Sequence, residues 1–100
     1  MTENLLKQIA QEYGVPSEAV KTIYTYYNKE KRKEVEKLAQ KWNLPHQETL
    51  KRLIIGLFEI HAPAIKQTLG PGGSIKISEN KEKDIKEIAK KYLEKLLKEE

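Results

Sequence analysis

Two eight-residue stretches decide how the chain is divided: IAQEYGVP at residues 9–16 and LAQKWNLP at residues 38–45. They match nearly position for position at an offset of 29 residues. In each stretch, apolar residues at helical spacing lead into a turn residue and a proline, after which helical spacing resumes. The repeat therefore predicts two tandem helical hairpins of the helix-turn-helix kind.

The whole chain, residues 1–100, is expected to form one mainly α domain, since this length supports a single hydrophobic core. The first hairpin is expected over residues 1–28 and the second over residues 29–62. The second hairpin is expected to end near His61, because Pro63 stops or kinks a helix.

Residues 63–79 predict a change of structure. The tetrapeptide GPGG separates two short stretches that are able to pair, so we expect a short β-hairpin, or wing, from about Ile65 to Ile77. Residues 80–100 carry an apolar stripe among lysine and glutamate, which predicts a long C-terminal helix. Because one small domain offers little surface to cover so wide a stripe, it also predicts a homodimer.

The second helix of the first hairpin is expected to begin at Ser17, the candidate N-cap. Its core positions are expected to be Val20, Ile23, Tyr24 and Tyr27. Tyr13 and Trp42 occupy matching positions of the repeat, and both are expected to be largely buried beside the turns. The segment TIYTYY also suits a β-strand. An alternative is therefore a ribbon-helix-helix dimer that reads DNA from that strand.

The charge favours a polyanionic partner, because the formal net charge is +4 and the basic residues concentrate in one region. Residues 21–41 hold seven basic and three acidic residues, whereas the rest of the chain is nearly balanced. Seventeen of the 19 basic residues are lysine, and together with the abundant glutamate this is the bias of proteins from thermophiles.

Several functional classes are disfavoured by composition. The absence of cysteine excludes disulfides, thiolate metal sites and cysteine nucleophiles. The only histidines, His46 and His61, are expected about 22 Å apart on one helix, too far to share a metal ion. We expect no enzyme activity, no cofactor, no metal and no small-molecule substrate. No apolar run approaches a membrane span and MTENLLKQ does not resemble a signal peptide, so we expect a cytoplasmic protein without membrane contact.

The first hairpin resembles the helix-turn-helix motif of DNA-binding proteins over residues 8–27. The resemblance is carried by a small residue at the helix crossing, a turn glycine and three apolar anchors. These are Ala10, Gly14, Val15, Val20 and Ile23. It implies that the outward face of the second helix enters the major groove, as expected of a small transcriptional regulator that binds duplex DNA with or without sequence preference.

The predicted contacts in that first hairpin are the polar and basic residues opposite the core stripe. They are Ser17, Lys21, Thr22, Thr25 and Lys29, with Glu18 as a discordant acid. Basic residues at the start of the next helix are expected to reach phosphates. They are Lys31, Arg32 and Lys33.

The second hairpin offers a competing assignment, because two helices, a Gly-rich hairpin and a long helix follow one another in the order of winged-helix regulators. That resemblance implies that residues at the start of the fourth helix read the groove and that a wing lysine contacts phosphate. The groove residues are His46, Gln47, Lys51 and Arg52, and the wing lysine is Lys66 or Lys76. We favour the first hairpin for base contacts because its outward face is more polar.

A rival from another class is a helical protein-protein interaction module or structural subunit that does not bind DNA. The two readings are separated by the salt dependence of DNA binding, since phosphate contacts weaken steeply with salt.

Overall fold

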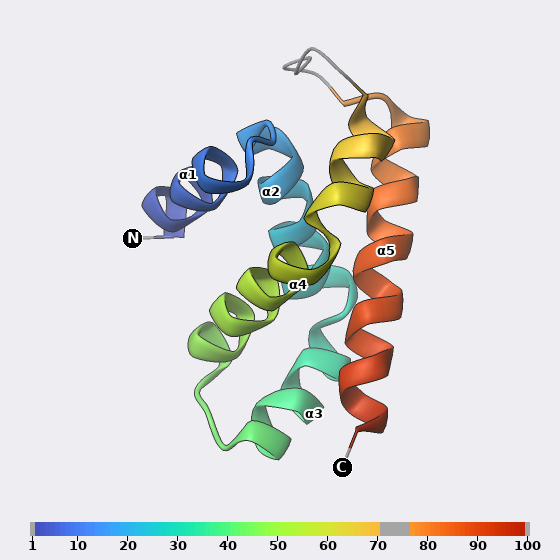
Figure 1. Cartoon of the computed structure of the whole chain (residues 1–100). Helices are drawn as coiled ribbons and strands as arrows, with labels where there is room; N and C mark the ends of the chain where they lie inside the picture. The colour runs from blue at the N-terminus through green and yellow to red at the C-terminus, as the bar shows by residue number, and fades with distance from the viewer. Residues whose placement is uncertain (1, 71–76, 100) are drawn as a thin grey trace.

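The computed structural model describes residues 2–70 and 77–99, and every regular element in that part of the chain is helical (Figure 1). The elements are α1 (Thr2–Tyr13), α2 (Ser17–Thr25), a π-helical turn (Tyr26–Glu30), α3 (Arg32–Trp42), α4 (His46–Leu69) and α5 (Glu79–Lys98). None of the helices in these two ranges has the length and hydrophobicity of a membrane span.

The two predicted hairpins are present, and their turns use the same backbone conformation. Gly14 and Asn43, at matching positions of the repeat, adopt left-handed conformations with φ of 67° and 56°. Asparagine tolerates this region better than most residues, which explains how it replaces the glycine. Pro16 and Pro45 then precede the second helices with extended backbone, so Pro16, not Ser17, is the N-cap of α2.

The two turns are also closed by equivalent hydrogen bonds. The amide of Val15 donates to the carbonyl of Ala10, and the amide of Leu44 donates to the carbonyl of Ala39, both at 3.0 Å. This bond from the second residue after a helix back to its last turn is the mark of a Schellman C-cap. The sequence repeat is therefore a structural repeat of the helix ending.

The predicted wing is wrong. Helix α4 runs without interruption from His46 to Leu69, so the residues expected to form the first strand are helical, and residues 2–70 and 77–99 contain no strand. The helix continues because Phe58, Ala62, Ile65 and Leu69 are buried at helical spacing on one face. The Gly-rich residues 71–76 lie outside the described part of the chain.

Proline at position 63 is accommodated inside α4 rather than ending it. Its ring has no N–H to bond the carbonyl of Glu59. Pro63 is exposed, so water can satisfy that carbonyl. Figure 1 shows α4 changing direction partway along its length, as a proline kink predicts.

The core is centred on α2, which contacts α1, α4 and α5. Ala19, Val20 and Ile23 are wholly inaccessible to solvent. The predicted core stripe is wrong at one position, because Tyr24 is only half-buried and Tyr26 is buried instead.

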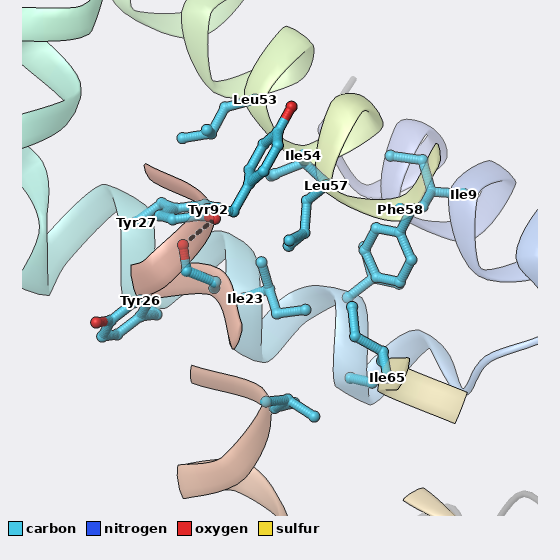
Figure 2. Close-up of a cluster of buried hydrophobic side chains, with 14 of the residues drawn as sticks. Ile9, Ile23, Tyr26, Tyr27, Leu53, Ile54, Leu57, Phe58, Ile65 and Tyr92 are labelled. Carbon is cyan, nitrogen blue, oxygen red and sulfur yellow. Dashed lines mark hydrogen bonds between the residues drawn. The ribbon is translucent and has the colours of Figure 1, made fainter. Parts of the chain in front are cut away.

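The π-helical turn extends α2 without a break and changes its periodicity after Thr25. The first hairpin, which was expected to end at residue 28, extends to Lys31. Both buried tyrosines face α5: the Tyr26 ring lies 5.8 Å from the Lys86 ammonium. The Tyr27 hydroxyl donates a 2.7 Å hydrogen bond to the carbonyl of Ala89 in the core (Figure 2).

The apolar stripe of α5 packs within the chain, against α2, α3 and α4. Its buried members are Ile85, Ala89, Tyr92 and Leu93. Most of the surface that suggested a homodimer is therefore covered by the chain itself, and dimerisation stays a prediction.

Helices α4 and α5 approach closely at Gly56, which allows a sharp test of their packing. A Cβ atom at Gly56 would overlap the hydroxyl oxygen of Tyr92 but would lie 3.4 Å from its Cζ atom, an ordinary contact. Gly56→Ala should therefore destabilise the protein by about 1 to 2 kcal/mol, although alanine is the better helix former. Urea denaturation followed by circular dichroism measures this change.

Tyr92→Phe supplies the matched control, since it removes only the overlapping oxygen. In the Tyr92→Phe background, Gly56→Ala is expected to be neutral or stabilising. Equal losses of stability in both backgrounds would contradict the assigned contact.

Candidate nucleic-acid interface

The outward face of α2 carries the first set of predicted DNA contacts. Ser17, Lys21 and Thr25 are exposed there, whereas Thr22 is half-buried. Lys29 is exposed on the π-helical turn, one turn after Thr25. This face consequently presents hydroxyl groups between two lysines, although Glu18 is exposed beside it.

The end of the first hairpin is joined to the start of the second through one side chain. The Asn28 side-chain oxygen accepts a hydrogen bond from His46 Nε2 at 2.9 Å and another from Arg32 Nη1 at 3.2 Å. Arg32 is held further by Glu36, whose carboxylate lies 3.3 Å from its Nε atom. These contacts fix the first turns of α3 and α4 next to the end of α2.

A groove between α1, α2 and α4, here called the α1–α2–α4 groove, extends this contact. Its volume is about 270 Å³. Its lining residues are Asn4, Leu5, Leu6, Gln8, Tyr24, Gln47, Glu48, Leu50, Lys51 and Ile54. Tyr24 from the first hairpin thus shares a surface with Gln47 and Lys51 from the second, both of which are exposed.

A second groove, the α3–α4–α5 groove, contains Arg52 and shares Glu48 and Lys51 with the α1–α2–α4 groove. Its volume is about 480 Å³, and its lining includes Trp42, Arg52, Glu59 and Tyr92. The Arg52 guanidinium lies 4.6 Å from the centre of the Trp42 ring, within the range of a cation–π contact. The Arg52 side chain therefore packs on Trp42, and we do not include it in the candidate interface.

The two aromatic residues at matching positions of the repeat, which were expected to be largely buried, both pack against the hydrophobic core. Trp42 and Tyr13 are both half-buried. Trp42 is partly covered by Arg52, and Tyr13 packs against Phe58 with ring centres 5.6 Å apart. Each aromatic residue therefore keeps one side open to solvent.

The remaining predicted contacts are scattered. Lys33 is exposed in the first turn of α3, and Lys31 is half-buried at the junction before it. Lys66 belongs to α4 rather than to a wing, and its ammonium lies against Gly14. Lys76 falls outside the described residues.

Two residues important for this surface were not predicted, Asn28 and Tyr24. Asn28 was expected only to be the last residue of the first hairpin, and its role depends on a tertiary contact that no local pattern encodes. Tyr24 was assigned to the core because a regular helix would place it with Ile23 and Tyr27. No protein-family model, curated protein or solved structure matches this chain, so its function has to be inferred from its own residues.

Proposed function

We propose that this protein binds duplex DNA through one surface, formed by the outward face of α2 and the first turns of α4. The observation that carries the proposal is the juxtaposition of candidate contacts from both hairpins. The hydrogen bond between Asn28 and His46 joins the two elements, and Tyr24 lines the same groove as Gln47 and Lys51.

The residues of this surface are of two kinds, one suited to contacting phosphates and the other to contacting bases. Lys21 and Lys51 supply positive charge for phosphate oxygens. Thr25 and Gln47 are uncharged hydrogen-bonding groups of the kind that meet base edges in the major groove. The acids Glu18 and Glu48 border the surface, where they would repel phosphate and accept hydrogen bonds from cytosine amino groups.

The salt dependence of binding tests the proposal. A fluorescently labelled duplex is titrated with protein at several salt concentrations, and anisotropy gives the affinity. Lys21→Gln and Lys51→Gln are each expected to weaken binding to all duplexes and to lower the slope of log affinity against log salt by about 1.

The control is Lys91→Gln, which changes an exposed lysine of α5 away from this surface. It is expected to leave the slope unchanged. The proposal is overturned if the wild-type protein shows no salt-dependent affinity for duplex DNA, or if all three variants behave alike.

A further inference from the structure

The floor of the α1–α2–α4 groove is apolar and incompletely covered by the protein. Leu6, Leu50 and Ile54 are buried beneath it, whereas Leu5 and Tyr24 at its sides are half-buried. Apolar surface left in contact with water in a concave site gains free energy when an apolar ligand replaces that water.

The size of the groove selects among occupants. Its volume of about 270 Å³ exceeds the roughly 150 Å³ that is sufficient for benzene in an engineered apolar cavity. Along α4 the lining extends from Gln47 to Ile54, which is about 10 Å of helix. A two-ring molecule of about ten non-hydrogen atoms spans this length, whereas a docked partner helix needs a longer groove.

The polar residues at the rim of the groove disfavour a charged ligand. The rim's two groups that are charged at neutral pH are Lys51 and Glu48, one of each sign. The other polar side chains are the Tyr24 phenol and the amides Asn4, Gln8 and Gln47, all of which both donate and accept hydrogen bonds. A charged ligand would lose hydration without meeting a net opposite charge, whereas a single hydroxyl group would find partners among the amides.

From these features we propose that the α1–α2–α4 groove binds a small, uncharged, mainly apolar molecule that carries one hydrogen-bonding group. The α3–α4–α5 groove is a built-in comparison, since it adds Arg52 and Glu59 to the Glu48 and Lys51 side chains that line both grooves.

The proposal is tested by NMR titration of the full-length protein, without DNA, with 2-naphthalenemethanol as the probe. Saturable shifts are expected for the Leu5 and Ile54 methyl groups and for the Tyr24 ring. The indole of Trp42, which lies in the other groove, should not shift. The anionic analogue 2-naphthoate and the cationic analogue 2-naphthylmethylammonium should each bind at least about threefold more weakly.

Two variants that fill the groove, Leu5→Trp and Gln8→Trp, are expected to abolish these shifts. Gln8 is exposed, so the second variant should fold even if the first does not. The matched control is Leu97→Trp, at a half-buried leucine of α5 outside both grooves, and it should bind the probe as the wild type does.

Three results would overturn the proposal: no saturable shift at the groove residues, shifts centred on Trp42, or unchanged binding by the folded filling variants. Equal or tighter binding of either charged analogue would overturn the assignment of an uncharged ligand. Because the titration contains no DNA, its failure is independent of any failure of the proposed DNA binding.

Discussion

A chain that ends at Ser78 is expected to be unfolded. Helix α5 contributes Ile85, Tyr92 and Leu93 to the core, and each buried side chain of this size stabilises a fold by about 1.5 to 3 kcal/mol. Its removal also exposes the surfaces of α2, α3 and α4 that it covers. The combined loss is comparable to the whole stability of a small domain, about 5 to 15 kcal/mol. Far-UV circular dichroism and the dispersion of amide NMR signals measure the outcome.

The control is a chain that ends at Lys98, which retains all of α5 and should fold as the full-length protein does. A folded chain ending at Ser78 would contradict the assigned role of α5 and would favour its use as a dimerisation element. Sedimentation of the full-length chain tests dimerisation separately, since a mass of 11.6 kDa at high concentration would contradict the predicted homodimer.

Replacing Tyr27 with phenylalanine is expected to destabilise the protein at neutral pH and to stabilise it at alkaline pH. At pH 7, Tyr27→Phe should cost about 1 to 1.5 kcal/mol, because it removes the buried hydrogen bond to the Ala89 carbonyl. At high pH the buried hydroxyl group instead lowers the free energy of unfolding. Burial, the largest cause, raises the pKa of Tyr27 in the folded protein well above its ordinary value of 10.0.

The sign of the alkaline effect follows from which state keeps the proton. Below pH 10 the Tyr27 phenol is protonated in both states, so it adds no pH dependence. Above pH 10 the phenol ionises in the unfolded chain but not in the folded protein. Folding then loses about 1.4 kcal/mol of stability per pH unit through this side chain.

The phenylalanine variant lacks this loss, so its free energy of unfolding should exceed that of the wild type above about pH 11. Urea denaturation of both proteins between pH 7 and pH 12 provides the comparison. Stability curves that stay parallel over this range would contradict the burial of the Tyr27 hydroxyl.

The hairpin repeat could be predicted from the sequence because helix endings are encoded locally. Gly14 and Asn43 are among the few residue types that adopt the left-handed conformation readily, and a proline two positions later favours extended backbone before the next helix. The outward position of Lys21 and Thr25 was predictable for the same reason, since helical periodicity assigns the faces of a short helix.

The prediction of a wing was wrong because the local turn signals compete with the burial of apolar residues farther along α4. Gly and Pro at residues 70–73 indicate a turn, and Pro63 argues against a continuing helix. However, the burial of Ile65 and Leu69 against the rest of the fold stabilises two further turns of α4, and Pro63 lies on the side facing water. Tertiary burial outweighed the local signal.

The arrangement of the candidate interface could not be predicted, because it depends on contacts between the hairpins. His46 and Asn28 are 18 residues apart and meet only after α4 packs beside α2. A 3.6-residue period also does not predict the π-helical turn that follows α2, nor that Tyr26 is buried while Tyr24 lines a groove. The sequence therefore predicted two alternative surfaces, one on each hairpin, whereas in the fold parts of both surfaces lie next to each other.

The central position of α2 also affects how the protein is made. Tyr27 and its partner Ala89 are 62 residues apart, so at about 5 to 20 residues per second the ribosome needs roughly 3 to 12 seconds to synthesise the chain between them. During that interval the face of the π-helical turn that later meets α5 has no cover. That face presents Tyr26 and Tyr27, whose hydroxyl groups can hydrogen-bond water before the Tyr27 hydroxyl donates to the Ala89 carbonyl. Until α5 is synthesised, this exposed tyrosine surface of the nascent chain is therefore less prone to aggregation than a surface with phenylalanine or isoleucine at positions 26 and 27.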